Sequence, residues 1–218
     1  MRRIITTILA TACAATAAVA LAAQPASAAT GHRIPEGFLL YEKAAAKDDH
    51  SEETSWRVSD RRGHTLAVNP CQDKSLARHG RAAARTIVYR APEFQRVEQV
   101  LLYRGVHEAR DAFGEVRAAL RRCEVNREEY GAYRYSWQRA PLGDEALRVA
   151  GQSYSGRKGD EVAVGGERAY VVRRGNAIMI YSEAAEYGMP KPAQYSQQRR
   201  DAAKMVAKIC AIARCHGA

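Results

Sequence analysis

The chain has 218 residues and a formal net charge of +10 at pH 7, or +8 once an N-terminal leader carrying Arg2 and Arg3 is removed. The remaining 189 residues suffice for one well-buried domain, and no segment after the leader is apolar and long enough to cross a bilayer. A positive charge of this size favours anionic surroundings such as phosphate-rich wall polymers, lipid headgroups or nucleic acid. Because basic and acidic residues alternate along the chain, charge alone does not choose among these partners.

Residues 1–29 have the pattern of a cleaved signal peptide. Arg2 and Arg3 precede an uncharged, Ala-rich run over residues 4–23, and small residues at 26–29 satisfy the −3 and −1 positions of a cleavage site. A membrane anchor is the competing interpretation, but the run is rich in Ala and Thr and ends at Pro25. Cys13 loosely resembles a lipoprotein processing site; it lacks the usual Leu and lies too early, so we do not expect lipidation there. The sequence therefore predicts a secreted or wall-associated protein.

Four cysteines remain after the leader is removed, and an even number in an exported protein indicates disulfides. The spacing favours the pairs Cys71–Cys123 and Cys210–Cys215. The chain-entropy relation predicts that they stabilise the fold by about 4 and about 2 kcal/mol, respectively. A pairing of Cys123 with the C-terminal helix stays open. The sequence Cys-x4-Cys-His at 210–216 offers no second ligand pair, so no metal site is expected.

The segment 30–84 is expected to be the irregular N-terminal part of the domain. An apolar patch at 38–41 predicts a short helix followed by an exposed polar loop, and Trp56 returns the chain to the core. Turn residues are frequent over 60–84, including Asn69-Pro70 and Gly80. The domain core is expected over 85–218.

Two strands and a helix are predicted next. Residues 86–89 are β-branched and aromatic, and residues 97–103 are apolar on both faces towards their end, as in a central strand. Apolar residues then recur at helical spacing from Ala109 to Cys123, which predicts an amphipathic helix.

An antiparallel meander is predicted for the second half. Strands are expected at 133–138, 147–154, 161–164, 168–174 and 177–181, with Gly165-Gly166 as a two-residue hairpin turn and Gly175-Asn176 as the next turn. An apolar stripe over 202–213 predicts a C-terminal helix. The expected fold class is α+β: a single antiparallel sheet with two main helices packed on one face and two disulfides.

No catalytic motif is present: the sequence lacks a Gly-x-Ser-x-Gly elbow, a His-Glu-x-x-His pair and a Gly-rich phosphate loop. The six histidines are scattered and are expected to be solvated surface residues. Asp144 and Glu145 are adjacent carboxylates, but neighbours in a strand point to opposite faces, so they are not expected to act on one substrate. We therefore expect no enzyme activity, no cofactor and no catalytic residue.

Tyr133, Tyr135 and Trp137 form one wholly aromatic strand face. Such a row could stack on bases or sugars, but it is more simply the inner face of the sheet filled against the helices. Tyr hydroxyls at its rim could still form a polar wall of a pocket.

The helix ending in Cys123, the sequence Gly-Asp-Glu-Ala-Leu at 143–147, Arg173-Arg174-Gly175-Asn176 and a Cys-bearing terminal helix together resemble the PknH-like extracellular sensor domain family of actinobacteria. The resemblance covers residues 85–215 and rests on motifs that are weak singly. It implies an α+β domain with two intramolecular disulfides and a cleft for a small ligand. It carries over no binding residues, and the absence of a kinase domain argues against direct signalling.

The leading functional hypothesis is an exported, non-catalytic, sensor-like domain that binds an unidentified small ligand or partner at the cell envelope. A secreted hydrolase without a local motif, and a basic protein that binds an anionic wall polymer or membrane surface, are the alternatives. No specific nucleic-acid partner is expected.

Overall fold

A computed structural model describes residues 33–47, 51 and 53–215. The predicted leader, its cleavage site and Cys13 lie outside the described residues, as do His32, His50 and His216. Within the described part, no helix is long and apolar enough to span a membrane.

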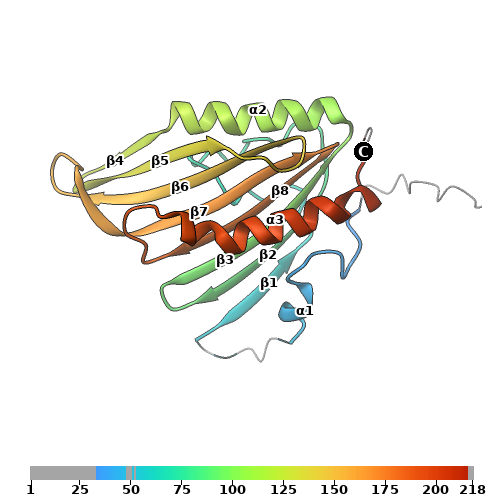
Figure 1. The fold of residues 1–218 in the computed structure, drawn as a ribbon, viewed down its shortest axis with the longest axis horizontal. Coiled ribbons are helices and arrows are strands. Elements are labelled where there is room, and N and C mark those ends of the chain that lie inside the picture. The colour runs from blue at the N-terminus through green and yellow to red at the C-terminus, as the bar shows by residue number, and fades with distance from the viewer. Residues whose placement is uncertain (1–32, 48–50, 52, 216–218) are drawn as a thin grey trace, which may run out of the picture.

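Eight strands form one fully antiparallel sheet in the order β1-β2-β3-β8-β7-β6-β5-β4 (Figure 1). The strands are β1 (Ser55–Ser59), β2 (Arg81–Ala91), β3 (Phe94–Tyr103), β4 (Val125–Glu128), β5 (Gly131–Arg139), β6 (Glu145–Ser155), β7 (Glu161–Arg174) and β8 (Ala177–Ala185). The α-helices are α1 (Glu42–Ala45), α2 (Val106–Arg122) and α3 (Ser196–Lys208), with 3-10 turns η1 (Pro192–Tyr195) and η2 (Ile209–Ala211).

The central strands are buried on both faces, which is why they are apolar without alternation. In β8, Ile178 and Ile180 face the core under α2, whereas Met179 and Tyr181 face the core under α3. All four side chains are fully buried. A fully buried apolar side chain contributes about 1.5–3 kcal/mol, so this strand supports two cores at once.

The expectation of two main helices on one face of the sheet is wrong. Among the described helices, one that is longer than a single turn covers each face: α2 packs through Phe113 and Val116 on one, and α3 packs through Ala202 and Met205 on the other. The physical reason is that both faces of the central strands are apolar and each needs cover. The uninterrupted apolar run at 177–181 was the signal for this in the sequence.

The prediction of a hairpin turn at Gly165-Gly166 is also wrong. Residues 161–174 form one continuous strand, and the two glycines lie at a bulge where the register with β6 shifts between Gln152 and Tyr154. Gly165 has φ +112°, a conformation that glycine adopts without strain. The predicted turn at Gly175-Asn176 is confirmed, with Gly175 at φ +56°.

Two disulfides join the pairs that the spacing favoured. Cys71–Cys123, with Cα atoms 5.3 Å apart, ties the 60–80 loops to the end of α2. Cys210–Cys215, with Cα atoms 5.5 Å apart, closes the turn after α3.

Asp144 and Glu145 converge on Arg173, contrary to the expectation that they point apart. Asp144 lies just before β6, so its carboxylate reaches the Arg173 guanidinium at 3.0 Å, and Glu145 reaches the same group at 2.9 Å. Asp144 also accepts the Gly175 N–H at 2.7 Å and pairs with Arg174 at 2.8 Å. Two of the motifs that carry the family resemblance, at 143–147 and 173–176, therefore form one corner of the fold, and their contacts there are structural.

Candidate ligand-binding hollow

Helix α2 covers only part of its face of the sheet. The left-hand ends of β5, β6 and β7 extend beyond the C-terminal end of α2 (Figure 1). Ala169, Val149 and Trp137 lie in register across β7, β6 and β5 and pack against the core under α2. The described helices leave the next row outward, towards these strand ends, without cover.

That outer row alternates longer and smaller side chains. Gln95 of β3 faces Ala184 of β8, which faces Glu167 of β7, which faces Gly151 of β6. Directly opposite residues of an antiparallel pair share one face, so all four contribute to the same floor. Glu167 is therefore flanked on both sides by residues with little or no side chain.

The sheet hollow, as we name this site, has a volume of about 630 Å³. Its wall combines the β2–β3 hairpin, the end of β8 and the bulged part of β7 with one residue each from β6 and β5. The lining residues are Arg90, Ala91, Glu93, Phe94, Gln95, Tyr133, Ser153, Val164, Gly165, Gly166, Ala184, Ala185 and Glu186. Glu167 lies beside this lining, next to Gly166 and opposite Ala184.

Glu167 is the most perturbed acid of the hollow. Its side chain is only partly buried, yet loss of hydration raises its pKa to about 7, against a smaller lowering effect of a hydrogen bond with Ser182 and of Arg168. Near neutral pH this carboxyl is therefore present both with and without its proton. Perturbed acids of this kind are enriched at functional sites.

Tyr133 and Tyr135 stand beside Glu167. Their ring centroids lie 5.1 Å apart at 64°, an edge-to-face arrangement. Burial, and secondarily the neighbouring Glu167, raises the pKa of both phenols, so both keep their hydroxyl protons. A Cβ built on Gly151 would lie 2.3 Å from the Tyr133 hydroxyl oxygen, so this glycine is what allows the ring to lie over the floor.

The bulge that shapes the hollow is held from beneath by Gln152. Its amide nitrogen lies 2.7 Å from the Ala163 carbonyl, 3.0 Å from the Gly165 carbonyl and 3.1 Å from the Tyr187 carbonyl. Its amide oxygen accepts from the fully buried Arg168 guanidinium at 3.0 Å. Arg168 also donates to the carbonyls of Gly151 and Glu167, so one buried network fixes the backbone of the floor.

The aromatic row predicted from sequence divides between two roles. Tyr135 and Trp137 are partly buried against the core under α2, as the filled inner face requires, whereas Tyr133 lines the sheet hollow. Sequence reasoning missed Glu167, Ser182 and Gln152. The available signal was a carboxylate between Gly166 and a run of buried strand residues, but nothing local places it on an uncovered face.

The fold, though not the sequence, resembles a solved structure. No protein-family model matches the chain, and no curated protein matches it. The chain is similar to the crystal structure of the extracellular domain of PknH from Mycobacterium tuberculosis, with a TM-score of 0.53 and 12% identity over 82% of this chain and 100% of that one. At this identity the likeness shows the fold alone. It agrees, at the level of the fold, with the resemblance noted in the sequence.

Proposed function

We propose that this protein is a non-catalytic, sensor-like binding domain of the cell exterior that holds a small polar ligand in the sheet hollow. The observation that carries the proposal is the position of Glu167. A carboxyl with a pKa near 7 lies beside the hollow, on the part of the sheet that α2 does not cover, between Ala184 and Gly151 and next to two tyrosines. Burying a carboxyl costs free energy, and acids perturbed in this way are enriched at functional sites, so the position of Glu167 favours a role in binding.

The chemistry of the hollow favours a ligand that bears several hydroxyl groups. The rings of Phe94 and Tyr133 offer flat apolar surfaces, and the Ser153 hydroxyl and the Gln95 amide offer donors and acceptors around them. The Glu167 carboxyl lies beside this lining. Sugars and sugar-like envelope fragments present this combination of faces and edges.

An extracellular location is supported by three independent features. The chain carries two disulfides, which persist in oxidising compartments. Residues 1–29 have the pattern of an export signal. The structure with a similar fold is the extracellular domain of PknH.

A thermal-shift screen tests the proposal. The protein from Thr30 onward is heated with a panel of envelope sugars, peptidoglycan fragments and other small envelope metabolites, because a ligand that binds only the folded state raises its melting temperature. We expect at least one compound to stabilise the wild type and to lose its effect in Ala184→Phe, which fills the floor of the hollow.

The matched control is Val58→Phe, an equally apolar change at an exposed position of β1 that should leave the stabilisation intact. No stabilisation by any compound, or equal stabilisation of wild type and Ala184→Phe, would contradict the proposed site. Turnover of a panel compound that Glu167→Gln abolishes would instead establish a hydrolase.

A further inference from the structure

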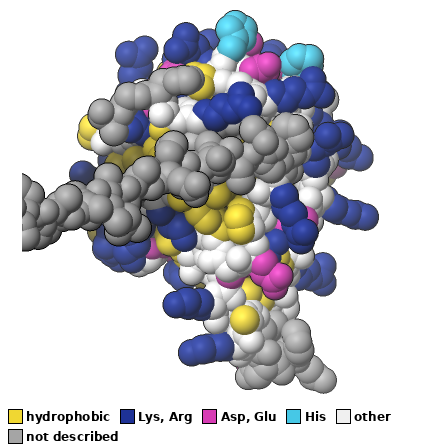
Figure 2. Space-filling model, turned by 90° about the vertical axis from the view of Figure 1, so that its right-hand side faces the viewer, with side chains coloured by type: hydrophobic (Ala, Val, Ile, Leu, Met, Phe, Trp, Pro, Cys, Tyr) yellow, Lys and Arg dark blue, Asp and Glu magenta, His cyan; other side chains and the backbone are white. Residues whose placement is uncertain are grey.

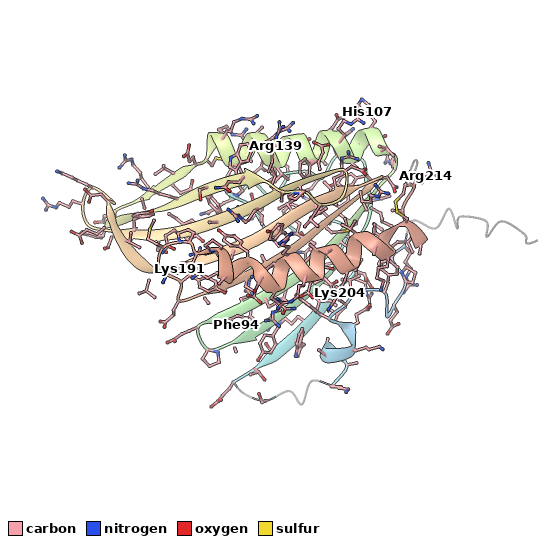
Figure 3. The ribbon with its side chains drawn as sticks, viewed as in Figure 1. Phe94, His107, Arg139, Lys191, Lys204 and Arg214 are labelled. Atoms are coloured by element: carbon pink, nitrogen blue, oxygen red, sulfur yellow. A yellow bond between two sulfur atoms is a disulfide. The ribbon has the colours of Figure 1, made fainter. Side chains whose placement is uncertain are left out.

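The end of the sheet opposite the sheet hollow is strongly basic. Figure 2 looks onto this end and shows Lys and Arg side chains along its top and right-hand sides, with histidines at the top. Figure 3 places His107 and Arg214 at this end, whereas Phe94, which lines the sheet hollow, lies at the tip of the β2–β3 hairpin. Any site at the basic end is therefore separate from the one already described.

A second hollow opens at this end with a volume of about 560 Å³. Three chain segments meet around it: the turn at 61–64, the turn before β2 and the link from β3 to α2. The Arg104 N–H donates to the Gly80 carbonyl at 2.9 Å and holds two of these segments together. We call it the arginine hollow, and its lining is Arg62, Gly63, Arg78, His79, Gly80, Arg81 and Arg104.

Arg81 gives the arginine hollow a buried positive charge. The residue is only 3% exposed, and its guanidinium donates to the backbone carbonyls of Arg62, His64, Leu76 and Ala77. Among the described residues it forms no ion pair with a carboxylate, and its Nε atom has no hydrogen-bond partner. Carbonyl dipoles solvate the charge without neutralising it, and burial lowers the pKa of the group.

The remaining basic side chains stand at the mouth of the hollow. Arg62, Arg78, His79 and Arg104 are exposed, and in the described part of the chain none of the three arginines pairs with a carboxylate. Arg78 donates to the Gly63 carbonyl at 2.9 Å, which keeps its guanidinium over the turn. Like charges gathered in this way repel one another unless an anion sits among them.

One acidic side chain borders this cluster. Glu108 lies against Gly80, and its carboxylate oxygen lies 2.7 Å from the position of a Cβ on Gly105, at the start of α2. A carboxylate there complements the positive end of the helix dipole. It lies beside the hollow and is not among its lining residues.

We propose that the arginine hollow binds a phosphate group. Guanidinium groups donate two parallel N–H bonds to phosphate oxygens, and several arginines converging on one hollow match a tetrahedral dianion or a phosphodiester better than a single carboxylate. Gly63 and Gly80 leave the floor without side chains; a Cβ on Gly63 would lie 2.3 Å from the Arg78 guanidinium nitrogen. The proposal does not depend on the sheet hollow, since no lining residue is shared.

The test is a titration of the protein from Thr30 onward with inorganic phosphate at constant ionic strength, followed by amide chemical shifts. We expect saturable shifts confined to residues 62–64, 78–81 and 104. Arg62→Gln/Arg104→Gln should weaken binding by about tenfold or more, since hydrogen bonds to charged groups are worth about 1.5–3 kcal/mol. Neither of these side chains makes a hydrogen bond in the described structure that the fold would lose.

The matched control is Arg157→Gln/Lys158→Gln, which removes the same charge from the exposed turn between β6 and β7 at the other end of the sheet. The control should bind as the wild type does. Shifts that do not saturate, or an equal loss of binding in both double variants, would show only a general attraction of anions and would overturn the proposal.

Two further probes identify the source of the phosphate. Soluble glycerophosphodiester and vesicles of phosphatidylglycerol in phosphatidylcholine are compared at equal phosphate concentration, with pure phosphatidylcholine vesicles as reference. If the wild type binds the anionic vesicles more tightly, and Arg62→Gln/Arg104→Gln abolishes this binding, the phosphate belongs to a lipid headgroup. If the wild type binds both probes equally well, the bound phosphate is a free or polymer-borne one.

Discussion

Glu167 shows how one residue can carry a functional argument that its neighbours in sequence do not reveal. It follows two glycines and precedes buried strand residues, a context in which a side chain normally serves only the sheet. Its significance comes from its cross-strand neighbours Ala184 and Gly151, which are distant in sequence, and from the Tyr133 ring that Gly151 admits beside it.

The raised pKa of Glu167 makes stability depend on pH. A carboxyl whose folded-state pKa of about 7 exceeds its ordinary 4.5 stabilises the fold below pH 4.5, and this contribution is lost as the pH rises to about 7. Glu167→Gln cannot ionise and keeps an acceptor for Ser182. Relative to wild type, the variant should therefore gain about 2 kcal/mol between pH 4 and pH 8, a value reduced for partial exposure.

Urea unfolding of both proteins at the two pH values measures this difference. Glu161→Gln is the control, because it removes a carboxylate from an exposed position of the same strand. If Glu167→Gln differs from the wild type by the same free energy at pH 4 and pH 8, the carboxyl is not perturbed in the fold.

The bulge in β7 is the element on which the shape of the sheet hollow depends. Gln152→Ala would leave the carbonyls of Ala163, Gly165 and Tyr187 and the Arg168 guanidinium short of partners. Leaving several buried polar groups unpaired should cost about 2–4 kcal/mol of the free energy of unfolding.

Equilibrium urea unfolding checks the prediction for Gln152. Gln138→Ala is the matched control, since Gln138 is exposed and accepts a single surface bond from Arg148; its effect should stay within about 0.5 kcal/mol. Similar losses in both variants would mean that the network under the bulge adds nothing to stability.

Substitution of Trp137 tests whether this part of the aromatic row belongs to the core and not to the binding site. It packs against the core under α2, so Trp137→Ala should lower the free energy of unfolding by about 3 kcal/mol. Tyr130→Ala, at an aromatic residue that is 74% exposed, should change it by less than about 0.5 kcal/mol. A Trp137 variant of undiminished stability would show that the ring belongs to a binding surface.

The elements differ in how well local sequence predicts them. Helix α2 was expected from Ala109 to Cys123 and runs over Val106–Arg122, because a helical apolar stripe is a local signal. Strands β1 and β4 were missed because they are short, largely polar edge strands whose pairing depends on distant partners. Gly165-Gly166 was assigned to a hairpin because local turn preference cannot distinguish a turn from a bulge.

The candidate site was less accessible to sequence than the fold. Tyr133 was recognised as a possible pocket wall, but Glu167 and Ser182 come from strands whose register fixes the site. The placement of helices on both faces was misjudged for a related reason, since an amphipathic helix does not specify which face of a sheet it covers. Strands that are apolar on both faces, such as β8, carry that information.

For the whole molecule, the two disulfides should contribute unequally. Cys71 and Cys123 are separated by 52 residues and Cys210 and Cys215 by 5. The chain-entropy relation then gives a loss of about 4 kcal/mol for Cys71→Ser/Cys123→Ser and about 2 kcal/mol for Cys210→Ser/Cys215→Ser. Urea unfolding of the two double variants tests whether the loss of Cys71–Cys123 lowers the free energy of unfolding more than the loss of Cys210–Cys215.

A thiol assay on the denatured, unreduced protein accompanies that measurement. It should find no titratable thiol in the protein from Thr30 onward. Four free thiols would contradict both the disulfides and the oxidising location inferred from them.

The two proposed sites lie at opposite ends of one sheet: the sheet hollow beside Glu167 and the arginine hollow around Arg81. Such an arrangement suits a domain that is retained at an anionic surface by one end and samples a small ligand with the other. Because the two proposed sites share no lining residue, substitutions in one should leave the other unchanged.

The central claim is that the sheet hollow binds the ligand, and amide chemical-shift mapping tests it most directly. The most stabilising compound of the envelope panel is titrated into the protein from Thr30 onward. The account predicts shifts at 94–97, 151–153, 164–168 and 182–186, absent in Ala184→Phe. Shifts confined to other parts of the sheet, or unchanged in Ala184→Phe, would contradict it.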